Sequence, residues 1–106
     1  MQTQRATGAA AITSSFTFTS GPVLLDEVRC HLSAAGGAGN MTITINRAAG
    51  AAYDLVIATQ DMTAVTDYHL IPSRPIYLFA GDTLDVAWAN AGTKTYGLEI
   101  FYRRTE

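Results

Sequence analysis

Residues 79–90, with the sequence FAGDTLDVAWAN, are the stretch from which the rest of the chain is best understood. The dipeptide Gly81-Asp82 predicts a tight turn, because both residue types accept turn conformations readily. After it, Leu84, Val86 and Trp88 alternate with smaller or polar residues, so their side chains would share one face of a β-strand. This strand holds the only tryptophan of the chain. We therefore place it at the centre of a small all-β core.

The same alternation of apolar and polar residues recurs along the chain, and it predicts about eight strands. They span residues 11–19, 23–33, 41–47, 53–59, 67–71, 76–79, 83–90 and 95–104. Residues 41–47 and 53–59 are predicted to form an antiparallel hairpin, and residues 91–94 a hairpin-type turn. Turn residues separate the strands at intervals of about 8 to 12 positions, which is typical of an antiparallel β-sandwich or a small barrel.

The predicted domain organisation is simple. A chain of 106 residues is expected to form one domain with a single core. We assign that β-sandwich domain to residues 11–106. Residues 1–10 are small and polar and show no periodicity, so they are predicted to be either a flexible arm or an extended segment that becomes ordered on a neighbouring molecule.

Charge is scarce in this sequence. Charged residues make up 15% of the chain, against about 25% in a typical globular domain. Lys94 is the only lysine. Protein interfaces are depleted in lysine and glutamate in the same way, so we expect much of the surface to contact other protein. A neutral surface without a partner is the simpler alternative.

The balance of charge and the pattern of hydropathy exclude other partners. The net charge of −2 argues against nucleic acid, because phosphate binding requires a basic excess. The apolar runs are too short to cross a bilayer, and the first residues do not resemble a secretory leader. We therefore expect no membrane partner and synthesis in a cytoplasm.

The last strand provides the candidate interface. Tyr96, Leu98, Ile100 and Tyr102 are predicted to face the core, which leaves Phe101 on the polar face. A large apolar side chain on that face is typical of a contact surface. The candidate interface residues are Phe101, Arg103, Arg104 and Arg5. The two terminal arginines would meet an acidic partner or a phosphate, or would simply keep the terminus solvated.

No residue pattern indicates catalysis, a metal or a cofactor. Cys30 is alone, so it cannot form an intrachain disulfide, and we expect an inert buried thiol. His31 and His69 lie on different predicted strands, and a zinc site would need two further ligands. Asp82 is expected to bond backbone amides in its own turn rather than to bind calcium.

Enzyme activity is not expected either. No Gly-x-Ser-x-Gly elbow occurs in the chain. Glu27 and Glu99 are carboxylates of the kind that cleave glycosides, but nothing in the sequence brings them together. We predict no catalytic, cofactor-binding or metal-binding residues.

The run PIYLFAGDTLDV at residues 75–86, followed by a glycine turn and a final aromatic strand through Tyr102, resembles the end of small jelly-roll proteins. The alanine-, threonine- and glycine-rich, lysine-poor chain with its small polar N-terminal segment is similar to minor virion proteins of tailed bacteriophages. These include capsid decoration proteins and other head or tail accessory proteins. The resemblance implies a jelly-roll β-sandwich without enzymatic activity.

The same resemblance implies where the protein works. The expected location is the virion, after synthesis in the host cytoplasm, and the expected partner is a phage capsid or tail protein. A homo-oligomer is expected, with a trimer favoured because shells offer local three-fold positions. The alternative is a carbohydrate- or receptor-binding module, in which exposed tyrosines would line a sugar platform. The candidates for that platform are Tyr53, Tyr68, Tyr77, Tyr96 and Tyr102.

Overall fold

The computed structural model describes residues 1–105, and its regular structure is almost entirely β. The described residues contain nine strands and one turn of 3₁₀ helix. They are β1 (Gln2–Gly8), β2 (Ile12–Thr17), β3 (Val23–Leu32), β4 (Asn40–Asn46), η1 (Ala51–Tyr53), β5 (Leu55–Asp61), β6 (Asp67–Leu70), β7 (Tyr77–Leu78), β8 (Thr83–Trp88) and β9 (Tyr96–Arg104). The predicted all-β fold is confirmed, with one strand more than expected.

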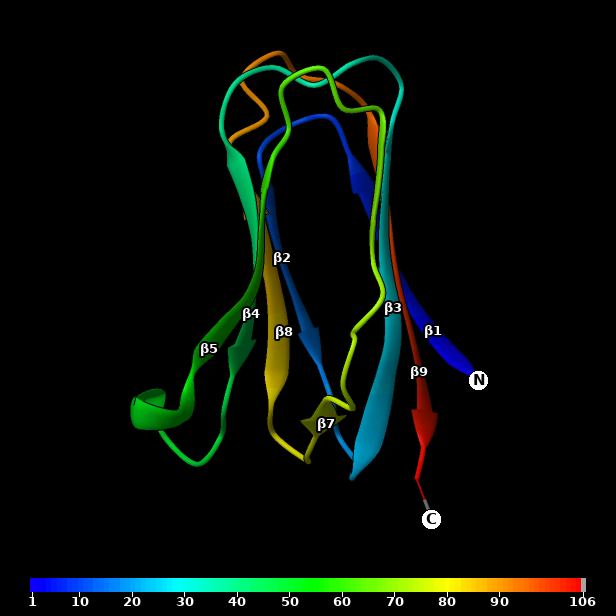
Figure 1. The fold of residues 1–106 in the computed structure, drawn as a ribbon, viewed down its shortest axis with the longest axis vertical. Coiled ribbons are helices and arrows are strands. Elements are labelled where there is room, and N and C mark those ends of the chain that lie inside the picture. The colour runs from blue at the N-terminus through cyan, green and yellow to red at the C-terminus, as the bar shows by residue number, and fades with distance from the viewer. Residues whose placement is uncertain (106) are drawn as a thin grey trace.

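The strands form two antiparallel sheets that face each other (Figure 1). Sheet A has the order β1-β9-β3-β6. The short strand β7 also pairs with β3, at Val23 and Leu24, whereas β6 pairs with β3 from Val28 to His31. Sheet B has the order β2-β8-β4-β5. The chain changes sheet after most strands, so that the first and last strands become neighbours, and this is the connectivity of a jelly roll. The predicted jelly-roll sandwich is confirmed.

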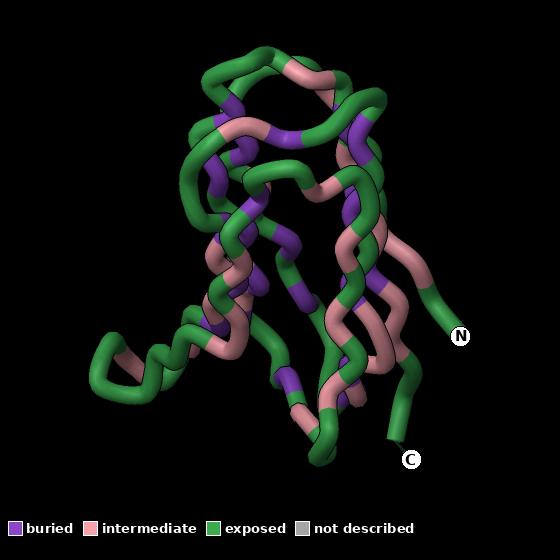
Figure 2. The backbone as a smooth tube through the Cα atoms, turned by 45° about the horizontal axis from the view of Figure 1, so that its top comes forward, coloured by how far each residue is buried: buried purple, intermediate pink, exposed green. Residues whose placement is uncertain are grey.

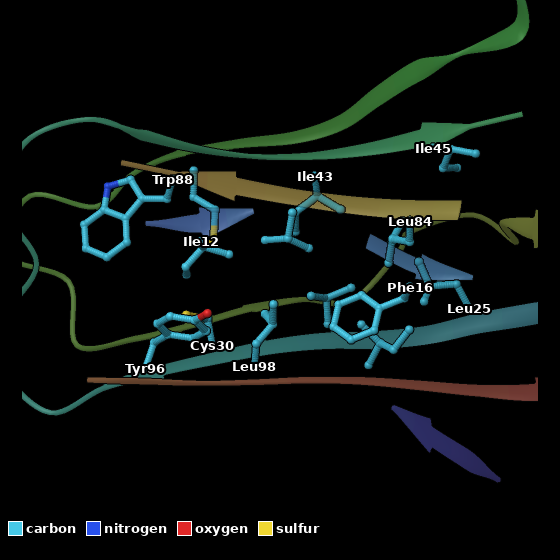
Figure 3. Packing of buried hydrophobic residues seen from close by; sticks show 14 of the residues in the cluster. Ile12, Phe16, Leu25, Cys30, Ile43, Ile45, Leu84, Trp88, Tyr96 and Leu98 are labelled. Carbon is cyan, nitrogen blue, oxygen red and sulfur yellow. The ribbon is translucent and has the colours of Figure 1, made fainter. Parts of the chain in front are cut away.

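The core lies between the two sheets, where the alternate side chains meet (Figures 2 and 3). Leu84 and Val86 are fully buried and Trp88 is 3% exposed, as their alternation predicts. Sheet A contributes Leu98 and Ile100 from β9 to the same interior. Burying such aliphatic side chains stabilises a fold by about 1.5–3 kcal/mol each relative to exposure. The packing of sheet on sheet is therefore what holds the domain together.

The expectation for residues 1–10 was wrong for most of that segment. Residues 2–8 form β1, which pairs antiparallel with β9 of the same chain. Gln4 Nε2 also donates hydrogen bonds to the carbonyl oxygen of Thr17 and to the hydroxyl of Tyr102, both at 3.2 Å. Main-chain pairing rather than apolar burial places this strand. An apolar-periodicity argument therefore could not detect it.

The prediction that residues 91–94 form a hairpin-type turn is also wrong, because the strands that this segment joins do not pair with each other. The segment joins β8 of sheet B to β9 of sheet A, so it crosses between the sheets. Asn90 holds this crossing: its backbone is left-handed, with φ of 47°, and its side chain is buried. Its Nδ2 donates to the carbonyl oxygens of Ala10 and Lys94, and its Oδ1 accepts from the N–H of Lys94. Asparagine tolerates this conformation better than most residues.

Asp82 anchors the opposite end of the sandwich. It is 2% exposed, and its carboxylate accepts the N–H of Phe79 and the N–H of Ala48, each at 2.9 Å. The predicted bond to an amide of its own turn is therefore confirmed. Arg47 Nη1 adds a third donor at 2.6 Å. Burial by itself raises the pKa of Asp82, but these donors outweigh it and hold the pKa below its usual value.

Candidate functional site

Exposed apolar side chains gather along one side of the sandwich. The structure describes seven large hydrophobic residues as exposed, and all but Met1 belong to two segments, residues 53–56 and 71–79. The six are Tyr53, Leu55, Val56, Ile71, Tyr77 and Phe79. We call them the apolar edge. Gathered apolar side chains at a surface mark an interaction site more often than scattered ones do.

The apolar edge lies where both sheets end. β5 is the last strand of sheet B, and β6 is the last strand of sheet A. In Figure 1, β5 borders sheet B and the chain leading to β7 borders sheet A at the same edge of the sandwich. The edge is therefore built from segments that the sequence separates and the jelly-roll connectivity brings to one side.

A groove of 330 Å³ lies between these two segments. Its lining is mostly aliphatic and consists of Leu55, Ile57, Leu70, Ile71, Pro72, Ser73, Arg74 and Ile76. Arg74 is the only charged residue in it. Its side chain is not seen to form a hydrogen bond or an ion pair with any of residues 1–105. The groove therefore combines apolar walls with one cation that has no partner among the described residues.

A second hollow, of 460 Å³, lies at the end of the apolar edge, and we call it the aromatic hollow. Tyr53 and Phe79 line it, and they are 66% and 50% exposed. Arg47 also lines it, with its guanidinium carbon 5.7 Å from the centre of the Phe79 ring. Because the same guanidinium donates to the carbonyl oxygen of Tyr77 and to Asp82, its position is fixed.

The edge of β5 has little of the usual protection apart from Asp61 at its end and a β-bulge at Ile57. Natural edge strands are commonly blunted by charge or proline, but residues 55–60 contain neither. A β-bulge at Ile57 shifts the pairing with β4, since Ile43 faces Ala58 while Thr44 faces Val56. Leu55 and Val56 consequently are both exposed although they are consecutive. The hairpin of β4 and β5 is confirmed, but its simple alternation is interrupted.

The outer face of sheet A has the opposite character, because charged side chains cover it in pairs. The pairs are Arg5 with Glu99 at 2.6 Å, Arg29 with Glu27 at 3.0 Å, His69 with Glu27 at 3.0 Å, Arg103 with Asp26 at 3.2 Å, and His31 with Asp67. Hydrogen bonds first from Arg29 and then from His69 hold the pKa of Glu27 below its usual value. Two shallow depressions of 490 and 450 Å³ lie on this face.

The structure places three of the four predicted interface residues on this charged face. Phe101 is half-buried beneath the guanidinium of Arg29, whose carbon lies 4.6 Å from the ring centre. Arg5 and Arg103 are in the ion pairs just described. Arg104 lies on the other side of β9, and its Nη2 donates to the hydroxyl of Ser20. Each is bound within its own chain, and their role as an interface stays a prediction.

The apolar edge was not predicted from the sequence. Two signals in the sequence point to it: the uncharged run at residues 55–60, and Ile71 just before a proline. Neither signal says that the two segments lie side by side. Only the pairing of β5 with β4 and of β6 with β3 does that.

Glu27 and Glu99, which nothing in the sequence brings together, both line the 490 Å³ depression on sheet A. Each carboxylate is nonetheless occupied by an arginine. Cys30 is buried behind this face, and desolvation raises the pKa of its thiol to about 11. His31, on the same strand, is exposed on the outer face. Residues 1–105 contain no cluster of three or more His, Cys, Asp or Glu that could hold a metal ion.

The part of the chain that the structure describes has no helix of the length and apolar character needed to span a bilayer. In comparisons with known proteins, no family model matches this chain, and no curated protein matches it significantly.

Proposed function

We propose that this protein is a structural accessory protein of a phage particle, which binds a capsid or tail component through protein–protein contacts. The observation that carries the proposal is the apolar edge, where six exposed hydrophobic residues gather on a surface otherwise poor in them. Such gathered apolar surface is unfavourable in water and is stabilised when another protein covers it. The jelly-roll fold supports the proposal, since viral capsid domains use it.

The aromatic hollow is the part of this edge that fits a particle surface best. Tyrosine, phenylalanine and arginine are enriched in the centres of protein interfaces. Tyr53, Phe79 and Arg47 supply one of each. The ion pair of Arg47 with Asp82 holds the hollow in one shape, which reduces the entropy lost on binding.

The many equivalent sites on a particle would raise the overall affinity above that of a single contact. A particle presents many copies of the same site, and a homo-oligomer that engages several of them gains avidity without any strong single contact. The mechanism is therefore the burial of modest apolar surface at many equivalent positions.

The test is co-sedimentation of the purified protein with heads and with tails separated from the virus that carries its gene. We expect the protein to pellet with one of these fractions and Phe79→Ala to weaken that binding. Thr13→Ala, an exposed change on β2 away from the apolar edge, serves as the matched control and should bind normally. Protein that stays in the supernatant with both fractions would overturn the proposal.

A carbohydrate-binding module is the second candidate, and the aromatic hollow favours it too. Two exposed aromatic rings beside polar groups could hold a sugar ring, as ligand pockets commonly combine apolar walls with a few polar groups. Reproducible binding on a glycan array, lost in Phe79→Ala, would favour this function over the first.

A further inference from the structure

We propose that β5 pairs antiparallel with β5 of a second copy of this chain, so that sheet B continues from one copy into the other. The pairing has two-fold symmetry, is centred on Ala58, and sets the second copy's Asp61 against Arg74. This deepens the proposed function, since it names the contact by which the protein self-associates, and it rests on that function only for the role of the dimer.

The main chain of β5 is the first reason. β5 forms the edge of sheet B and pairs only with β4 among the described strands. Its outward N–H and C=O groups are therefore available to another strand, as in β-strand addition generally. A two-fold pairing centred on Ala58 uses the whole strand, because Leu55 then lies opposite the second copy's Asp61.

The exposed side chains are the second reason. Leu55 is 61% exposed and Val56 is 53% exposed, and Ile71 across the groove is 62% exposed. In the register centred on Ala58, Val56 lies opposite the second copy's Gln60 and Ile57 opposite its Thr59, so the pairing covers these side chains with an uncharged part of the strand. An isologous contact must be self-complementary, and this register repeats the same residue pairs on both sides of the two-fold axis.

Charge complementarity is the third reason, and it indicates that the strand bound at this edge is β5 of a second copy. Arg74 is the one charged residue of the groove, where it lies with Leu55. Two prolines, Pro72 and Pro75, flank it and restrict the backbone that carries it. Because residues 55–60 are uncharged, Asp61 is the acidic residue that β5 itself would bring to the Leu55 end of the other copy.

Asp61 is suited to this partner. The N–H and the hydroxyl of Thr63 donate to its Oδ1 at 3.0 and 2.8 Å. These two bonds hold the carboxylate in place, and no donor within residues 1–105 is seen on its Oδ2. The backbone and side-chain bonds from Thr63 also keep the pKa of Asp61 below its usual value, so the group is ionised at neutral pH.

Light scattering coupled to size-exclusion chromatography tests the inference on the full chain. We expect wild-type protein to reach twice the 11.3 kDa chain mass as its concentration rises. Arg74→Asp and Asp61→Arg should each weaken the dimer about tenfold or more, because one substitution sets like charges together at both ends of a two-fold contact. The double variant should dimerise again, since the charges are exchanged.

Lys94→Asp makes the same charge change in the loop between β8 and β9 and should leave the dimer intact. Far-ultraviolet circular dichroism checks that each variant is folded. A wild type that remains monomeric at hundreds of micromolar would overturn the inference, as would a dimer that neither charge reversal weakens or that the double variant fails to restore. Particle binding is measured separately with Phe79→Ala, so either proposal can fail while the other stands.

Discussion

Arg47 Nη1 lies 2.6 Å from Asp82 Oδ2, and this contact ties the loop after β4 to the turn before β8. The Asp82 side chain is 3% exposed and the Arg47 side chain 24% exposed, so the carboxylate is buried while the guanidinium stays partly in contact with solvent. The two segments belong to different parts of the sequence but to one end of the sandwich. Their junction also forms one wall of the aromatic hollow.

Replacing Asp82 should destabilise the whole domain. Asp82→Ala leaves the Arg47 guanidinium and the amides of Phe79 and Ala48 without their acceptor. Breaking a buried pair by removing one partner typically costs about 3–5 kcal/mol. Urea denaturation should show a loss in this range. Asp85→Asn, on the same strand but in a more exposed position, should lose less than half as much.

The same carboxylate should make stability depend on pH. The folded state lowers the pKa of Asp82, so its contribution is fully present above the unfolded-state pKa, about 3.9. That contribution is lost as pH falls through the lower folded-state value. Thermal melts should therefore show wild type losing stability below about pH 4. Asp82→Ala should lose less over the same range, and parallel curves for the two proteins would contradict this account.

Shortening a core side chain should cost far more than shortening the same side chain at the apolar edge. Leu84 is fully buried on β8, whereas Leu55 on β5 is 61% exposed. Leu84→Ala should destabilise by about 2–5 kcal/mol, because it leaves a cavity. Leu55→Ala should stay within about 0.5 kcal/mol of wild type. Equal losses in chemical denaturation would mean that β5 is covered within the isolated chain.

Cys30 should be unreactive in the native protein. Its thiol is buried and its pKa is raised to about 11, so almost none of it is the nucleophilic thiolate at neutral pH. A chromogenic disulfide reagent should label it only after unfolding. Labelling in native buffer as fast as in denaturant would show that the thiol is exposed.

Deleting residues 1–8 should damage the fold rather than remove an arm. β1 covers the outer edge of β9 from Tyr96 to Tyr102. Without it, the main-chain groups of β9 become a free edge that pairs with other molecules. The truncated protein should melt at a lower temperature and aggregate more in light scattering. Unchanged melting would restore the interpretation of this segment as an arm.

The core faces of the strands were readable from the amino-acid order alone. Val28, Cys30 and Leu32, like Leu84, Val86 and Trp88, alternate with smaller or polar residues, and all six are buried. Alternation is a local property with a period of two residues, so it survives in the sequence without knowledge of the neighbours. The all-β sandwich and the bonding role of Asp82 in its turn were predictable for this reason.

The pairing of the strands, and with it the candidate site, was decided by the tertiary structure. Gln4 and Arg5 carry no apolar signal, and only β9 alongside them makes a strand of that segment. The bulge at Ile57 arises from the register with β4, and only the fold places Arg74, which has no ion-pair partner among residues 1–105, beside Leu55. Hydrogen-bond pairing joins residues far apart in the chain and is nearly independent of side-chain identity. The residue order therefore determined which faces are buried, while the assembled sheets decided which edge stays open.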